Sequence, residues 1–259
     1  MDSTVSSIVR APRDVGELQY GLELQSAVLR ERGQPGPALE AARRFHRVVD
    51  SVAGRPSRDP FVRLPEALAL LELGATDPRA ARAAAKLFND MATMPMYSEP
   101  RMARHRVWMW THEASALALA GDTAALPGLA RRIEEQSLLS AYGRDQRMPF
   151  YVTGLLLEAR RDWLGAAEAY RRAIWSPTEN HVSPRLARAL LASGRPAEAI
   201  PVLQSWLRGP LDAANQYVRR SEVHRLLGEA FQKLNRQDSA SAHYAWVRGA
   251  GRPAPSGAQ

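Results

Sequence analysis

A repeated spacing of small and large apolar residues constrains the fold of this chain more than any other feature. Gly154, Ala166, Tyr170 and Ala173 are separated by 12, 4 and 3 positions, and the same intervals recur in three further segments. These further copies are Gly228, Ala240, Tyr244 and Val247; Ala187, Ala199, Leu203 and Trp206; and, more weakly, Ala114, Leu126, Ala130 and Ile133. Self-similarity of this kind indicates a repeat architecture.

Each copy predicts a pair of helices joined by a short break. A small residue on the first helix lets the second helix approach closely, and the larger residue of the second helix fills the gap between them. Short polar segments such as "ARRDW" around Asp162 reverse the chain between the two helices. One pair cannot bury both of its faces, so successive pairs must stack.

These units resemble tetratricopeptide repeats, closely over 147–248 and more loosely over 104–137. Two features depart from the family pattern. Tryptophan is absent from the first position of the first helix in the best copies, and Ala187 and Gly228 are 41 positions apart rather than about 34. The segment "LRGPLDAANQ" therefore carries an insertion or longer helices. The resemblance implies an all-α, right-handed α-solenoid of about six antiparallel helical hairpins.

The remaining sequence divides into segments of different character. We expect a disordered N-terminus over 1–13, degenerate hairpins over 14–91 and a connection rich in methionine and proline over 92–103. The tetratricopeptide-like repeats span 104–248, and a disordered tail rich in glycine and proline covers 249–259. Asp59–Pro60, Asp77–Pro78 and Ser183–Pro184 each predict a helix start, with a capping residue followed by proline.

Composition excludes several classes of protein. The chain of 259 residues has no cysteine, so disulfides, thiolate metal sites and cysteine nucleophiles are excluded. No secretory signal and no membrane span are recognisable, and we expect a cytoplasmic protein without membrane contact. The net charge of +8 comes almost entirely from arginine. Because many arginines have carboxylates at helical spacing, a salt-bridged surface is a sufficient explanation.

No motif predicts catalysis, a metal or a cofactor. His105 and His112 are seven residues apart, about 10 Å along one helix, which is too far to share an ion. The stretch 101–116 also combines Arg104 with Trp108 and Trp110, a combination that suits base stacking beside phosphate. The alternative is that these tryptophans pack against the neighbouring hairpin. This stretch is kept as a secondary surface, and nucleic-acid binding as an alternative function.

The resemblance implies that peptide ligands lie on the concave face, along the first helix of each hairpin. The positions that map there with binding potential are Tyr151, Leu155, Glu158, Arg188, Arg225, Glu229, Gln232 and Lys233. His181 and Glu222 map to the same face. Arg188 and Arg225 can pair with an acidic peptide. The alternative is that these charged side chains only solvate the groove.

The expected function is therefore a non-catalytic scaffold for a peptide or a partner domain. Chains of this arginine- and alanine-rich style suggest the regulatory part of a bacterial signalling or transcription system. The last repeat ends near Val247 without a polar capping helix, which terminal repeats normally need. A partner, a second copy of the chain or a further segment would cover that face. A homo-oligomer is thus an open alternative, and an enzyme is a third alternative without a supporting motif.

Overall fold

The regular structure of the chain is helical throughout the part that the computed structural model describes, residues 2–95, 97–176, 181–208 and 218–250. Short 3-10 helices η1 (Pro60–Val62), η2 (Thr123–Ala125) and η3 (Asp145–Arg147) lie between the longer ones. The α-helices are α1 (Asp2–Arg10), α2 (Val15–Glu31), α3 (Pro35–Ala53), α4 (Leu64–Leu73), α5 (Pro78–Thr93), α6 (Arg101–Ala120), α7 (Leu126–Leu139), α8 (Met148–Ala159), α9 (Trp163–Ala173), α10 (Val182–Ala192), α11 (Pro196–Leu207), α13 (Arg220–Lys233) and α14 (Gln237–Ala250). The expectation of an all-α protein is confirmed for these residues.

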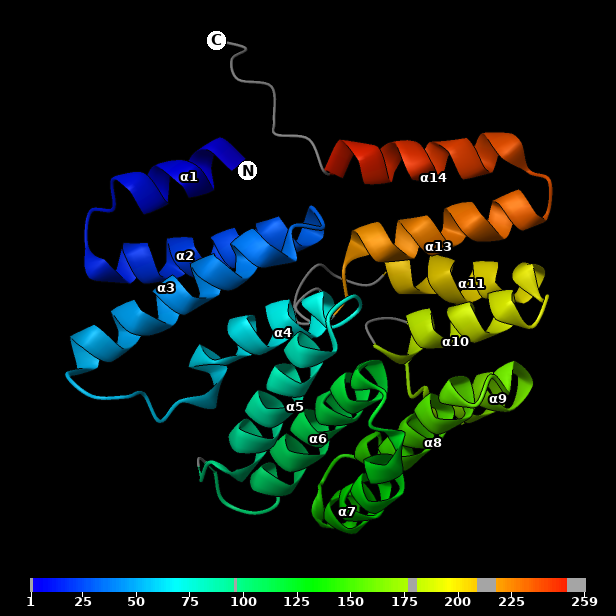
Figure 1. The fold of residues 1–259 in the computed structure, drawn as a ribbon, viewed down its shortest axis with the longest axis horizontal. Coiled ribbons are helices and arrows are strands. Elements are labelled where there is room, and N and C mark those ends of the chain that lie inside the picture. The colour runs from blue at the N-terminus through cyan, green and yellow to red at the C-terminus, as the bar shows by residue number, and fades with distance from the viewer. Residues whose placement is uncertain (1, 96, 177–180, 209–217, 251–259) are drawn as a thin grey trace.

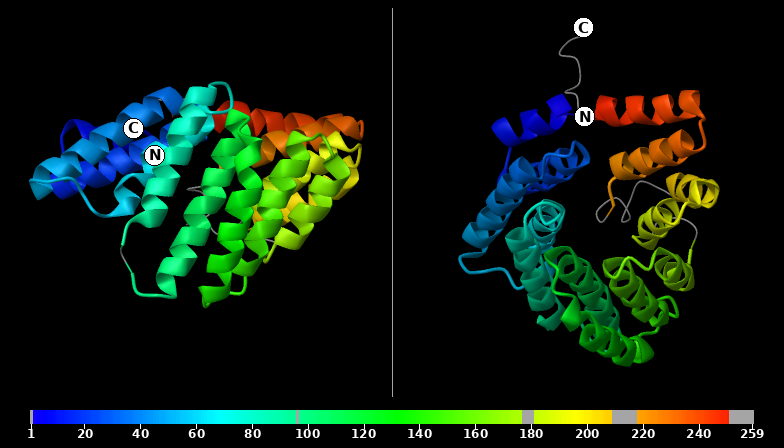
Figure 2. Two further views of the ribbon diagram at one scale, coloured as in Figure 1. Left: turned by 60° about the horizontal axis from the view of Figure 1, so that its bottom comes forward. Right: turned by 45° about the vertical axis from the view of Figure 1, so that its right-hand side comes forward.

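Successive helices of the described residues pack against one another, and some helices also touch beyond their immediate neighbours, as α6 touches α8 and α10 touches α13. Figure 1 and Figure 2 show the resulting row curving around a central space, with α1 and α14 at its two ends. The curvature brings the end of α2 to the start of α13, where the backbone N–H of Arg220 donates to Glu31 at 2.9 Å. Helices α4, α6, α8, α10 and α13 face this central space, and the end of α2 reaches it.

The repeated spacing has the packing consequence that the sequence predicts. A Cβ added to Gly154 would lie 2.4 Å from the Tyr170 ring, and one added to Gly228 would lie 2.6 Å from the Tyr244 ring. Each tyrosine hydroxyl then donates to a side chain one turn beyond the glycine, Glu158 at 2.5 Å and Gln232 at 2.9 Å. The close approach of the paired helices at these positions is confirmed.

Helix starts follow the predicted signals at two of three positions. Asp59 accepts from the backbone N–H of Phe61 and Asp77 accepts from that of Arg79, in both cases with proline at the first helical position. The prediction is wrong at Ser183, because α10 already begins at Val182 and His181 stands at its N-cap. Ser183 is a buried residue of the first helical turn.

One large apolar core runs from Leu64 to Ala240 and links α4 to α14. A smaller cluster joins α1, α2 and α3 with η1 and includes Val9, Leu22, Phe45 and Val62. Within the segment 1–13, for which we expected disorder, the structure places α1, whose Ile8 packs against Gly21. The expected tail lies outside the described residues except for 249–250, which belong to α14, and most of "LRGPLDAANQ" also lies outside them.

Candidate functional site

The inner helices enclose a polar cavity at the centre of the curve. Its volume is about 140 Å³, and α4, α6, α8, α10 and α13 all contribute to its wall. The polar lining residues are Glu72, His112, Ser115, Tyr151, His181, Arg185, Arg188, Arg219 and Glu222. Arg188 and Arg219 have side chains about one-third exposed, so the cavity reaches solvent beside them.

An ion-pair network holds one side of this cavity and joins two distant parts of the chain. The Arg30 Nε donates to Glu72 Oε1 at 2.8 Å, and Arg219 Nε lies 3.7 Å from the same oxygen. The arginines therefore share a single carboxylate. Burial raises the pKa of Glu72, although Arg30 and Arg219 act in the opposite direction. Glu31 extends the junction by accepting from the backbone N–H and hydroxyl of Ser221.

A second network runs along α8, α10 and α13. Arg185 donates to Glu158 at 3.0 Å, and Arg188 donates to Glu222. Burial alone would raise the pKa of Glu222, but Arg188, Arg219 and Arg185 together hold it below the ordinary value. Because breaking a buried pair leaves an uncompensated charge, these pairs fix the inner helices relative to one another.

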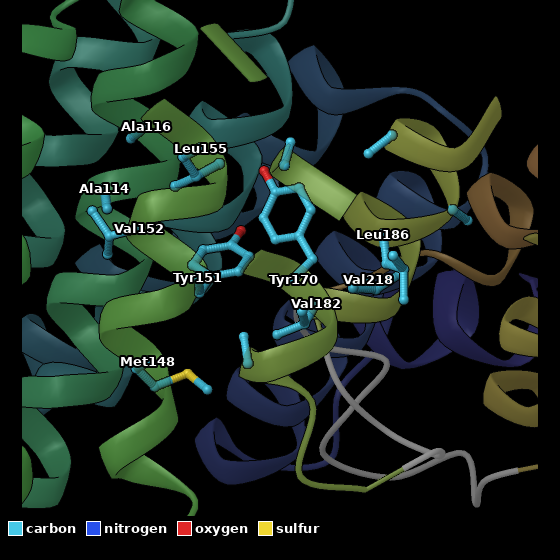
Figure 3. Packing of buried hydrophobic residues seen from close by; sticks show 14 of the residues in the cluster. Ala114, Ala116, Met148, Tyr151, Val152, Leu155, Tyr170, Val182, Leu186 and Val218 are labelled. Carbon is cyan, nitrogen blue, oxygen red and sulfur yellow. The ribbon is translucent and has the colours of Figure 1, made fainter. Parts of the chain in front are cut away.

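Histidines and aromatic rings form the deepest wall. The His181 ring lies 4.8 Å from the Tyr151 ring, 5.0 Å from His112 and 5.4 Å from Trp108, measured between ring centroids. Burial, with a smaller effect of Arg185, lowers the pKa of His181 to about 4, so this side chain is neutral at pH 7. The hydroxyls of Tyr151 and Ser115 are 2.8 Å apart and hydrogen-bonded. Figure 3 shows Tyr151 beside Tyr170, which supports it from α9.

The predicted groove residues of α8 and α10 have unequal accessibility. Tyr151 lines the cavity but is only 2% exposed, and Leu155, at 1% exposed, belongs to the apolar core. Leu155 therefore presents no accessible surface. Glu158 is engaged by Arg185 and Tyr170, whereas Arg188 retains exposed surface at the mouth of the cavity.

The predicted residues of α13 lie at a more open surface. Arg225 Nη1 is 3.4 Å from Glu229 Oε2, and both side chains are more than one-third exposed. Gln232 is exposed and accepts a hydrogen bond from Tyr244 on α14, and Lys233 is exposed at the end of the helix. Arg225 also influences the pKa of Glu222, which places it near the cavity rim.

The arginine–tryptophan stretch of α6 is largely packed. Trp110 is 7% exposed and lies under the Arg132 guanidinium. Trp108 donates from Nε1 to the buried Asp145 at 3.2 Å, and Arg104 stacks on Tyr142 at 3.9 Å. The tryptophan rings therefore support neighbouring helices, and neither presents an open face for base stacking.

Sequence reasoning did not identify Arg30, Glu72 or Arg219 as part of the site. Each lies far from the others along the chain, so local spacing carries no signal for their association. Among the described residues, no group of three or more histidine or acidic side chains is arranged to hold a metal ion. Within the same residues, every helix is too short or too polar to cross a membrane.

Comparison with known proteins adds no relative from which a function could be transferred. No protein-family model matches the chain, and no curated protein sequence matches it.

Proposed function

We propose that this chain is a non-catalytic scaffold that binds an acidic segment of a partner protein on the inner face of α10 and α13. We further propose that its helices form a right-handed solenoid of antiparallel hairpins of the tetratricopeptide type. The recurrence of one glycine–tyrosine contact, with the same hydrogen bond one turn later, supports this repeat assignment.

The distribution of accessible charge on the inner face carries the functional proposal. Arg188 on α10 and Arg225 and Lys233 on α13 have accessible side chains, and Arg219 is partly exposed at the start of α13. Among the described residues, Glu222 pairs with Arg188, Glu229 pairs with Arg225, and Arg219 shares Glu72 with Arg30. These ion pairs leave positive charge at Lys233 and, in part, at Arg219. Carboxylate groups of a partner would form charge-assisted hydrogen bonds with this surface.

The test compares two variants that lose the same charge from different faces. Arg225→Ala/Lys233→Ala removes two exposed cations from α13, and Lys86→Ala/Arg131→Ala removes two exposed cations from α5 and α7. Tagged proteins with unchanged circular dichroism would be used to capture partners from lysate of the source organism, with and without nuclease treatment.

We expect a specific protein to be captured by the wild type and by the α5/α7 variant and to be lost with the α13 variant. Equal retention by all three proteins would contradict the proposed surface. Capture that disappears on nuclease treatment would instead support nucleic-acid binding. Capture of untagged copies of the same chain would identify a homo-oligomer.

A further inference from the structure

The central cavity contains buried polar atoms without hydrogen-bond partners among the described residues. His181 is 9% exposed, and neither its Nδ1 nor its Nε2 has a partner; Glu72 Oε2 is likewise buried and unpaired. Each such atom destabilises the folded state if it stays unpaired, because it has lost its hydrogen bonds to water. Buried polar groups in proteins nearly always have partners. Glu72 on α4 and His181 at the start of α10 line the same cavity. Their unpaired atoms therefore indicate that polar molecules occupy it.

The charge around the cavity favours an anion. Among the described residues, the charged side chains that line the cavity are three guanidinium groups and two carboxylates, which leaves one positive charge. The guanidinium groups belong to Arg185, Arg188 and Arg219, and the carboxylates to Glu72 and Glu222. The unbalanced positive charge lies at Arg219, because its partner Glu72 is closer to Arg30 than to Arg219. Arg219 is also one of the two residues at the mouth, where a ligand would enter.

The volume limits the size of the occupant. A cavity of about 140 Å³ is close to the engineered cavity of about 150 Å³ that accepts benzene, so it holds on the order of six to ten non-hydrogen atoms. Such a molecule needs a carboxylate for Arg219 and Arg188 and a donor for Glu72 Oε2. The neutral His181 can both donate and accept, and it therefore suits a polar group between those two ends.

We propose that this cavity is a binding site for a small organic carboxylate that also carries a hydrogen-bond donor, the chemistry of a free amino acid or a small hydroxy acid. Its carboxylate lies toward Arg219 and Arg188, and its amino or hydroxyl group lies toward Glu72. This site shares Arg188 and Arg219 with the proposed partner surface, whereas Arg225 and Lys233 do not line it. The Arg225→Ala/Lys233→Ala variant therefore leaves the cavity residues unchanged.

The probes are the standard L-amino acids, L-lactate and glycolate, each added to the purified chain at millimolar concentration. Binding is followed by the melting temperature and by the total tryptophan fluorescence, to which Trp108 contributes from its position beside His181. Isothermal titration then gives the affinity of each active probe. We expect at least one probe to raise the melting temperature saturably, because a ligand that binds the folded state stabilises it. Acetate, which has a carboxylate but no such donor, should bind more weakly than that probe.

Two variants change the cavity and a third serves as the control. Arg219→Gln removes the cation at the mouth, and His181→Leu removes the polar wall with little change in volume. His224→Leu is the matched control, since His224 stacks on Trp246 and does not line the cavity. We expect Arg219→Gln and His181→Leu each to weaken binding by about tenfold or more, the effect of one hydrogen bond to a charged group. The control should bind as the wild type does.

Failure of every probe to bind the wild type would overturn the proposal and assign the cavity to water. Binding that neither cavity variant weakens would overturn it as well, because the ligand would then lie elsewhere. Partner capture with the α13 variant tests the scaffold function independently, and so failure of one proposal does not imply failure of the other.

Discussion

Substituting alanine for Gly154 tests the physical basis of the repeat directly. The new Cβ would lie 2.4 Å from one ring carbon of Tyr170 and 2.6 Å from another. Tyr170 is fully buried and its hydroxyl is bonded to Glu158, so the ring has no free direction in which to move. The paired helices must therefore separate, or the ring must leave its position.

The expected magnitude follows from two opposing effects. Overpacking of a filled core costs about 1–3 kcal/mol, while replacing glycine by alanine within a helix gains about 1 kcal/mol. We expect Gly154→Ala to lower the free energy of unfolding by about 0–2 kcal/mol. Gly128→Ala in α7 is the matched control, because its added Cβ would meet nothing within 4 Å. This control should gain about 0.5–1 kcal/mol.

A compensating substitution is available within the protein itself. At the corresponding positions of another repeat, the pair is Ala187 and Leu203 instead of glycine and tyrosine. Gly154→Ala/Tyr170→Leu should therefore be more stable than the two single losses predict. The assay is chemical denaturation followed by circular dichroism at 222 nm. A Gly154→Ala protein as stable as Gly128→Ala would refute the argument.

Three further predictions concern hydrogen bonds and charge. Tyr170→Phe should cost about 1 kcal/mol in denaturation experiments, and Tyr244→Phe should cost less because its bond is exposed; equal losses would contradict this. Burial raises the pKa of Glu113 to about 7, above its unfolded value, so ionisation of this group lowers stability as pH rises from about 4.5 to 7. Glu113→Gln should remove that contribution from melting profiles, and an unchanged profile would disprove it. Glu31→Ala should cost about 1–3 kcal/mol and speed hydrogen exchange at the start of α13; unchanged exchange there would argue against the junction.

The sequence predicts the helical content and the pairing of small and large residues because both depend on local spacing. Gly154 and Tyr170 are only 16 positions apart, on consecutive helices joined by a short turn. Local spacing also carries a signal for helix α1. Its Val5, Ile8 and Val9 have the spacing of one helical face, which indicates packing rather than disorder.

The contacts at the centre of the molecule could not be predicted from local spacing. Glu31 and Arg220 are 189 positions apart, and their contact depends on the summed curvature of every intervening helix. Likewise, the repeat pattern places Leu155 on the inner face without indicating whether neighbouring helices cover it. Curvature and neighbour distance together decide which inner residues become core and which line the cavity.

Hydrogen–deuterium exchange of the chain, with and without its captured partner, tests the central claim most directly. The account predicts slower exchange on partner binding in peptides from α10 and α13, with the helices on the outer side of the curve unchanged. Protection confined to α9, α11 or α14 would contradict binding on the inner face and would place the partner on the outside of the helix row.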